Sequence, residues 1–429
     1  MADYKKMWQE LDVNLEMHDK LCEVLPMFYE DIYLSQENRP EGMNYFNFVI
    51  SEVHGLRIQE LQDAKKDGKT VVGSFCLYVP DEITLALGGV PVGICSGSEF
   101  WVPAGEEVLP RNTCPLVKAS IGAKLSKTCP YFQSCDIVVG ETTCDAKKKA
   151  WEILEEHMPM HVMDLPQKKT GRDYESWKKE IETYGQVLSE RTGRTLELHK
   201  IKESIKLTNK KREALKRLYD FRKVDPSPIS GKDALLISQI AFYDDIERFT
   251  LKTEELCDEL QKRVDENIGV FEKGTPRILI TGTPMSIPNW KIHDIIETSG
   301  ALVVCEETCT GTRYFENLVD ANAETLEDMY KNLSERYLGI NCACFTPNDG
   351  RIDDIIRYVK EYNVDAVVYN SLSFCGTYAV ESYKVSRALK EAGIPVLVLE
   401  SDYSEEDRGQ IKTRVEALVE MVKARKEGL

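Results

Sequence analysis

Two segments of the chain, residues 136–144 and 365–375, repeat one pattern that limits the possible fold more than any other feature. The first reads DIVVGETTC and the second reads DAVVYNSLSFC. Each starts with aspartate, continues with a valine-rich apolar run and ends at a cysteine just before a helix-like segment. Parallel strands need such crossover connections, usually a helix. We therefore expect two copies of one parallel-sheet unit.

Strand-like runs and helical segments alternate around both repeats. The other expected strands are residues 71–76, 90–95 and 160–163 in the first half, and 277–282, 301–305 and 394–399 in the second. This alternation predicts an α/β fold with two doubly wound parallel-sheet (Rossmann/flavodoxin-like) domains. The expected division is a helical N-terminal cap (1–66), a first α/β domain (67–168), a helical connector (169–273) and a second α/β domain (274–429).

Charge and hydropathy exclude some classes of partner. The net charge is -17 over 429 residues, which argues against a nucleic-acid partner because phosphates need a basic surface. No apolar run reaches about 18 residues and no secretory signal is visible, so we expect no membrane span and a cytoplasmic protein. Thiols stay reduced there, so the 13 cysteines point to metal binding or catalysis before disulfides.

Several cysteines stand where strands end and helices begin. Cys144 and Cys375 both occupy such positions, where ligands bind in parallel sheets and where a helix N-terminus stabilises a thiolate. Each half of the chain offers three thiolates from different loops. They are Cys114, Cys129 and Cys144 in the first half, and Cys309, one of Cys342 and Cys344, and Cys375 in the second. We expect the two sets to enclose a metal centre between the domains.

Other motifs are absent from the sequence. It contains no C-x-x-C, which argues against a zinc ribbon, a bacterial ferredoxin and a thioredoxin-type dithiol. It also has no Walker-type loop, no G-x-G-x-x-G after a strand and no H-E-x-x-H. The remaining cysteines without a turn-type context are interpreted as core residues: Cys22, Cys76, Cys95, Cys135 and Cys257.

A set of motifs in fixed order resembles a known superfamily. The motifs are YVPDE (78–82), LGGVP (87–91), NTCPL (112–116), TTCD (142–145), CTGTRYF (309–315) and FCGTY (374–378). Together they resemble the 2-hydroxyacyl-CoA dehydratases and benzoyl-CoA reductase-related proteins over about residues 56–165 and 275–420. For a dehydratase subunit, the resemblance implies one [4Fe-4S] cluster held by Cys114, Cys144 and Cys375.

The additional cysteines are similar to those of the double-cubane cluster proteins in this superfamily. That resemblance implies an [8Fe-9S] cluster held by six cysteines, here Cys114, Cys129, Cys144, Cys309, Cys344 and Cys375, with Cys342 as the alternative to Cys344. It also implies a homodimer and a separate ATP-hydrolysing iron–sulfur activator protein. Ala146 departs from the pattern, which has glycine after Cys-Asp.

The expected function is therefore reductive. Low-potential electrons from the activator would reduce a small substrate at the cluster, and Glu141, Thr142, Thr143 and Arg313 are candidates for supporting or proton-transfer groups. One alternative is an (R)-2-hydroxyacyl-CoA dehydratase subunit with a single [4Fe-4S] cluster, a cavity for CoA and a second subunit. Another is an electron-storage or cluster-carrier protein without catalysis. The iron content per chain distinguishes the reductase with a double-cubane cluster from the dehydratase subunit with a single cluster.

Overall fold

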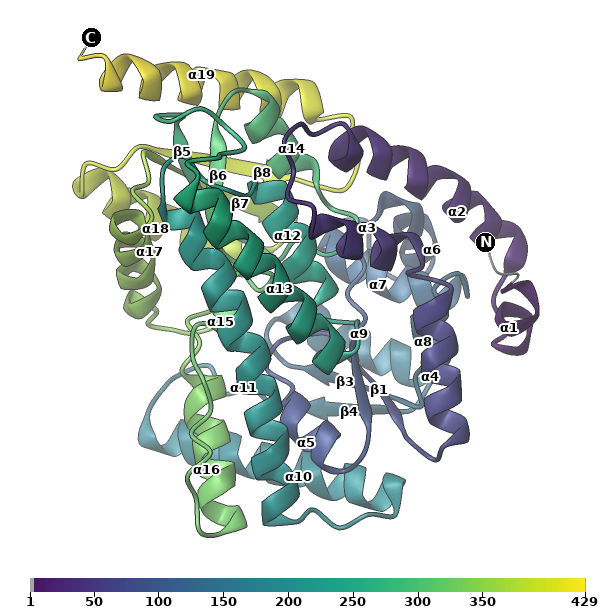
Figure 1. Cartoon of the computed structure of the whole chain (residues 1–429). Coiled ribbons are helices and arrows are strands. Elements are labelled where there is room, and N and C mark those ends of the chain that lie inside the picture. Colours follow the sequence, from purple (N-terminus) through teal and green to yellow (C-terminus); the bar gives the residue numbers. More distant parts are fainter. Residues whose placement is uncertain (1–3, 429) are drawn as a thin grey trace.

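Two four-stranded parallel sheets form the centre of the computed structural model, which describes residues 4–428 (Figure 1). The first sheet has the order β2-β1-β3-β4 and the second has the order β6-β5-β7-β8. The strands of the first sheet are β1 (Val71–Ser74), β2 (Val90–Gly93), β3 (Ile137–Glu141) and β4 (Met160–Met163). Those of the second are β5 (Arg277–Gly282), β6 (Leu302–Glu307), β7 (Ala366–Leu372) and β8 (Val396–Ser401). The predicted α/β fold and the repeated unit are confirmed.

The two sheets share their topology strand by strand. In the first, Val72 of β1 lies between Pro91 of β2 and Ile137 of β3. In the second, the central strand β5 is flanked in the same way by β6 and β7, with a register shift after Ile278 against β6. All pairings are parallel, so the carboxyl ends of the four strands in each sheet share one edge.

Burial on both faces explains why the strands could be predicted from the sequence. Every residue of β3 and β7 is buried, as expected for strands covered by helices on both sides. The first sheet is accompanied by α5 (Asp81–Ala86), η2 (Glu99–Trp101), α6 (Val102–Glu106), α7 (Pro115–Leu125), α8 (Pro130–Ser134) and α9 (Asp145–Glu155). The second is accompanied by α14 (Lys291–Thr298), α15 (Thr312–Phe315), α16 (Leu326–Leu338), α17 (Asp349–Glu361), α18 (Gly376–Glu391) and α19 (Arg408–Lys426).

The N-terminal segment is helical, as predicted, and it reaches the second unit. Its helices are α1 (Lys5–Glu10), α2 (Leu15–Tyr29), the π-helical η1 (Glu30–Leu34), α3 (Met43–Ser51) and α4 (Leu56–Lys66). The rings of Phe28, Tyr29 and Tyr33 contact Trp290, which directly precedes α14. Helix α4 instead packs on α8 of the first unit. The segment therefore spans both units.

The connector is also helical, with α10 (Gly171–Thr192), α11 (Leu198–Asp220), η3 (Phe221–Lys223), α12 (Gly231–Ile240) and α13 (Ile246–Asp265). Helix α11 joins the two units through a buried ion pair and hydrogen bonds. Arg212 pairs with Glu82 of α5 at 2.7 Å, and Tyr337 of α16 donates to the same carboxylate at 2.7 Å. Helix α10 packs against both β4 and α16. The domain limits expected at residues 66, 168 and 273 stay a prediction.

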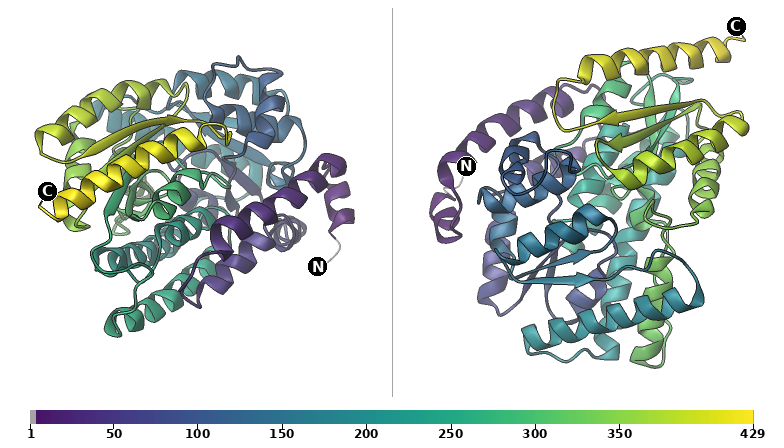
Figure 2. Two further views of the ribbon diagram at one scale, coloured as in Figure 1. Left: turned by 90° about the horizontal axis from the view of Figure 1, so that it is seen from above. Right: turned by 180° about the vertical axis from the view of Figure 1, so that it is seen from behind.

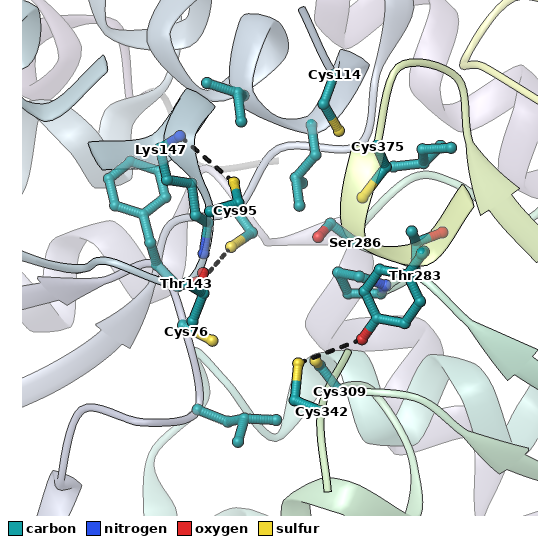
Figure 3. Close-up of a pocket in the computed structure, with 18 of the residues that line it drawn as sticks. Cys76, Cys95, Cys114, Thr143, Lys147, Thr283, Ser286, Cys309, Cys342 and Cys375 are labelled. Atoms are coloured by element: carbon teal, nitrogen blue, oxygen red, sulfur yellow. Dashed lines mark hydrogen bonds between the residues drawn. The ribbon is translucent and has the colours of Figure 1, made fainter. Parts of the chain in front are cut away.

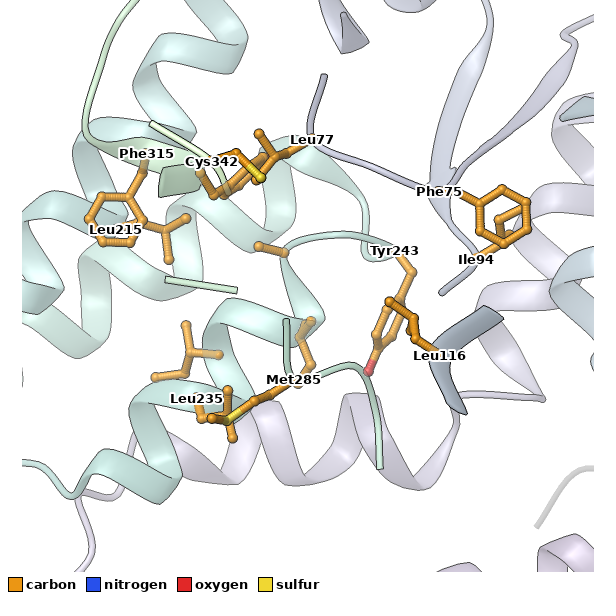
Figure 4. Packing of buried hydrophobic residues seen from close by; sticks show 14 of the residues in the cluster. Phe75, Leu77, Ile94, Leu116, Leu215, Leu235, Tyr243, Met285, Phe315 and Cys342 are labelled. Carbon is orange, nitrogen blue, oxygen red and sulfur yellow. The ribbon is translucent and has the colours of Figure 1, made fainter. Parts of the chain in front are cut away.

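One continuous core extends across both units. Figure 2 shows the two units beside each other in both views, the first in blue and the second in green to yellow. Phe75, Ile94 and Leu116 of the first unit belong to the same buried cluster as Met285 and Phe315 of the second (Figure 4). Among residues 4–428, no helix is long and apolar enough to cross a membrane.

Candidate metal site between the two sheets

A pocket of about 530 Å³ opens between the two units, and cysteine is the most frequent residue in its wall (Figure 3). Eight of the chain's 13 cysteines line it: Cys76, Cys95, Cys114, Cys144, Cys309, Cys342, Cys344 and Cys375. They come from the first unit and from the second in equal number. The pocket therefore collects thiols from segments that are far apart in the sequence.

Strand ends and helix starts position most of these sulfurs. Cys144 directly precedes α9, and the backbone N–H of Lys147 donates to its Sγ atom at 3.5 Å. Cys114 precedes α7 and Cys375 precedes α18 in the same manner. The free N–H groups of a helix start carry partial positive charge, which favours a thiolate over a thiol.

Backbone strain marks the turn into α18. Phe374 has φ of 62°, in the left-handed region that is uncommon for residues other than glycine. This conformation ends β7 and brings the following Cys375 to the pocket wall, while the Phe374 ring remains 58% exposed. The surrounding structure therefore holds Phe374 in a conformation that phenylalanine itself disfavours.

Two of the close thiol pairs bridge the units. The Cys114 thiol donates to the sulfur of Cys375, which lowers the pKa of Cys375 to about 7. In the second pair, a hydrogen bond from the Cys76 thiol likewise lowers the pKa of Cys309. Each pair thus holds one sulfur that becomes a thiolate more readily than an ordinary cysteine, and thiolates are the form that binds metal.

The third close pair lies within the second unit, in the loop between α16 and α17. The Cys344 thiol donates to Cys342 and lowers the Cys342 pKa well below its ordinary value. The hydroxyl of Tyr378 lies 3.5 Å from the Cys342 Sγ atom. Cys342 therefore has the surroundings of a thiolate.

A buried cation lies close to the sulfurs in each unit. In the second unit, the Arg313 guanidinium lies 3.9 Å from Cys309 Sγ, and it also binds the Glu307 carboxylate and the Tyr378 hydroxyl. In the first unit, Lys147 pairs with the fully buried Glu141. Burial lowers the pKa of Lys147, but Glu141 and the thiols Cys76, Cys95 and Cys144 outweigh this effect and raise it well above its ordinary value. These cations offset the negative charge of several thiolates in one apolar cavity.

Apolar side chains complete the pocket and reduce its contact with water. Phe75, Leu116, Phe242, Ile287 and Leu372 are among the lining residues. The hydroxyls in the wall belong to Ser74, Thr143, Thr283, Ser286, Thr310, Thr377, Tyr243 and Tyr378. Electrostatic interactions are stronger in such surroundings than in water.

The structure brings together all but one of the cysteines that the sequence analysis proposed as ligands. Cys114, Cys144, Cys309, Cys375 and both members of the Cys342/Cys344 pair line the pocket.

Cys129 does not line the pocket. It directly precedes α8, and burial raises the pKa of its thiol while the backbone N–H groups of the first turn and Lys124 lower it. Cys129 therefore does not join Cys114 and Cys144 at the pocket, contrary to the expectation from the sequence.

Sequence reasoning missed Cys76 and Cys95, which it treated as core residues. Cys76 comes just after β1, the central strand of its sheet, much as Cys144 and Cys375 come just after β3 and β7. That relation was readable in the sequence. Cys95 follows β2, but its thiol donates to the backbone carbonyl of Phe75 at 2.6 Å, so it is occupied by a structural hydrogen bond.

The four proposed supporting groups have different surroundings. Thr143 lines the pocket, and Glu141 and Arg313 stand behind the sulfurs. Thr142 instead donates to Asp164 and accepts from the backbone N–H of Leu165, so its role is structural.

The donor set fits an iron–sulfur cluster and exceeds what a single ion needs. Four ligands satisfy a tetrahedral ion, whereas this cavity offers eight soft sulfur donors in a space of about 530 Å³. Soft thiolates suit iron–sulfur clusters. The arrangement can therefore hold a group with several metal ions.

Comparison with known proteins is consistent with this geometry. Residues 76–422 match the sequence family described as "2-hydroxyglutaryl-CoA dehydratase, D-component". "Putative dehydratase subunit YjiM" of Escherichia coli (strain K12) is 38% identical over 380 residues, covering 87% of this chain and 97% of that protein.

More distant relatives are enzyme subunits. The (R)-phenyllactyl-CoA dehydratase beta subunit of Clostridium sporogenes is 21% identical, covering 88% of this chain and 98% of that protein. A benzoyl-CoA reductase subunit of Thauera aromatica is 22% identical, covering 77% of this chain and 84% of that protein. The similarity to these proteins therefore extends over most of the chain and includes segments of both units.

Proposed function

Because the chain belongs to the 2-hydroxyglutaryl-CoA dehydratase D-component family, we propose that it is an iron–sulfur reductase subunit that holds an [8Fe-9S] double-cubane cluster. Low-potential electrons from a separate ATP-hydrolysing activator protein would reduce a small substrate there, and the protein would act as a homodimer. The observation that carries this proposal is the set of eight cysteines around one pocket, supplied equally by both units.

Six of the eight cysteines are proposed as ligands, three from each unit. They are Cys76, Cys114 and Cys144 in the first unit, and Cys309, Cys342 and Cys375 in the second. This set differs from the sequence prediction in two places. Cys76 replaces Cys129, which does not line the pocket, and Cys342 replaces Cys344 because Cys342 accepts hydrogen bonds that favour a thiolate.

When bound, the cluster would supply storage and transfer of electrons at low potential. The chain's own residues tune this property. Arg313 and Lys147 balance negative charge next to the sulfurs, and backbone N–H groups at the starts of α7, α9 and α18 act on the sulfurs of Cys114, Cys144 and Cys375. The apolar wall lowers the local dielectric constant, which strengthens these charge interactions.

Tyr378 is the proposed proton-holding group closest to the sulfurs. Burial raises the pKa of its hydroxyl well above the ordinary value, so the hydroxyl stays protonated. It can therefore donate toward Cys342, 3.5 Å away. Thr143 and Ser286 offer further hydroxyls in the wall for orienting a small polar substrate.

A dehydratase subunit with one [4Fe-4S] cluster is the second candidate, supported by the names of the relatives. It would use Cys114, Cys144 and Cys375 and would need space for an acyl-CoA. The additional thiols Cys76, Cys309 and Cys342 have no role in that scheme. Two of them nevertheless have polar partners: Arg313 contacts Cys309, and Tyr378 contacts Cys342. The geometry therefore favours the larger cluster.

Iron and sulfide analysis of anaerobically purified protein, with low-temperature EPR, tests the proposal. About eight iron atoms per chain support the double cluster, and about four support the dehydratase. Zinc without iron would contradict both. A catalytic assay with activator, ATP and a small unsaturated substrate then separates a reductase from an electron-storage protein, which would accept electrons without turnover.

A further inference from the structure

Two histidines and a cysteine meet on the N-terminal helical segment, outside the cysteine-lined pocket. His18 and Cys22 lie one turn apart on α2, and His54 lies between α3 and α4. The ligand-type atoms of the three side chains all lie within 4.8 Å of one another. None of them lines the cysteine pocket. We propose that these three residues form a separate binding site for Zn²⁺ or a similar divalent transition metal.

The distances between the donor atoms are close to those around a bound zinc ion. Zn–N bonds of about 2.0–2.1 Å and Zn–S bonds of about 2.3 Å place donors about 3.3 Å (N to N) and about 3.6 Å (N to S) apart in a tetrahedron. Here His18 Nε2 lies 3.0 Å from His54 Nδ1, and Cys22 Sγ lies 3.7 Å from both ring nitrogens of His18. The spacing therefore matches a zinc site, and coordination requires Cys22 Sγ to move toward the space between the two imidazoles.

The two imidazoles are held in place before any metal binds. His18 is fully buried, and its ring packs on Trp8 with centroids 4.3 Å apart. The Trp8 indole N–H donates to the backbone carbonyl of His54 at 2.7 Å, which fixes the segment that carries the second ring. Such supporting contacts orient metal-binding histidines.

The protonation states of the two histidines suit a metal, whereas partial burial raises the pKa of the Cys22 thiol to about 11. Burial lowers the pKa of His18 to about 4 and that of His54 to about 3, so both rings are neutral at pH 7 and have a lone pair available. Cys22 is exposed to solvent. A metal held by the three side chains would therefore displace the Cys22 proton and keep a fourth position for water.

A hydrogen bond between His18 and His54, with Cys22 merely nearby, is the competing explanation for this cluster. Addition of Zn²⁺, without other metals, to the full-length protein with its iron–sulfur site intact distinguishes a metal site from this hydrogen bond. The measurement is the alkylation rate of Cys22, followed by peptide mass spectrometry, which reads this thiol separately from those of the pocket. We expect Zn²⁺ to slow Cys22 alkylation at least tenfold, and an unchanged rate overturns the proposal.

Two histidine variants test whether His54 is a ligand. We expect H54Q, at a half-buried position, to abolish the protection, whereas H199Q, at an exposed histidine outside the cluster, retains it. Protection that persists in H54Q indicates simple binding of zinc to a surface thiol and overturns the site.

A second measurement does not depend on alkylation. Co²⁺ added to the same holoprotein should give a thiolate-to-metal charge-transfer band that is lost in C22S. Because Cys22 is exposed, this variant is expected to fold normally, which a thermal melt checks. A band of equal intensity in C22S and in the unmodified protein also overturns the site.

Discussion

The hydroxyl of Tyr378 lies 3.5 Å from the Sγ atom of Cys342 and also receives a hydrogen bond from Arg313. Hydrogen bonds to sulfur ligands raise the reduction potential of an iron–sulfur cluster. We expect Tyr378→Phe to keep its iron and to shift the potential to more negative values by roughly 20–60 mV, the equivalent of one net hydrogen bond for a one-electron step. Redox titration followed by EPR measures this shift. Loss of iron in this variant would instead assign Tyr378 a structural role.

Cys76 and Cys129 form a matched pair for testing the ligand set. Both are poorly accessible cysteines of the first unit, but only Cys76 lines the pocket. We expect Cys76→Ala to lose at least about half of the iron, and Cys129→Ala to keep all of it with a stability loss of about 1 kcal/mol. Iron and sulfide analysis with a thermal melt gives both values. The reverse result would restore the prediction from sequence.

The neighbouring thiols Cys342 and Cys344 allow a second comparison. Cys342 accepts from Tyr378 and from Cys344, whereas the bond with Cys342 raises the pKa of Cys344. We expect Cys342→Ala to change the EPR spectrum and lower the iron content, and Cys344→Ala to leave both nearly unchanged. If only Cys344→Ala loses iron, the sixth ligand is Cys344.

Arg313 and Arg351 both bind the buried Glu307 carboxylate, but only Arg313 contacts a cysteine. Removing either guanidinium leaves a buried charge incompletely paired, so Arg313→Gln and Arg351→Gln should each cost about 3–5 kcal/mol of stability. Arg313→Gln alone should also make the cluster potential more negative, by roughly 50 mV or more. Denaturant unfolding and redox titration separate the two effects, and equal potentials would contradict a tuning role for Arg313.

The metal-free protein should show an unusually reactive Cys375. A hydrogen bond from the Cys114 thiol lowers the pKa of Cys375 to about 7, so the thiolate is the minor form below that pH and the major form above it. Alkylation of Cys375 should therefore reach half of its maximal rate near pH 7. In Cys114→Ala the donor is gone, and the midpoint should move toward the value of an ordinary cysteine, about 8.5. An unchanged profile would exclude the contact between Cys114 and Cys375.

The strands were predictable because a strand that is buried on both faces consists of consecutive apolar residues. The same holds for Cys144 and Cys375, whose positions directly after such runs placed them at the functional edge of each sheet. Cys76 follows the same rule after β1, but the absence of a turn-type context made it resemble a core residue.

Other features depend on three-dimensional packing that sequence periodicity does not encode. Cys129, which directly precedes α8, does not line the pocket. The contact of α16 with α10, and the aromatic contact of α2 with Trp290, connect segments that have no matching pattern in the sequence. Cys342 receives hydrogen bonds from Cys344 and from Tyr378, a residue of another helix, and the sequence pattern predicts neither contact.

The supply of pocket thiols by both units has a consequence for biosynthesis. Cys76, Cys114 and Cys144 leave the ribosome long before Cys375, the last thiol of the pocket to be translated. The proposed cluster would need sulfurs from both units, so its insertion would follow translation of Cys375. Until then Cys76, Cys114 and Cys144 would have to stay reduced, and oxidation of the nascent chain would yield full-length protein that cannot be loaded.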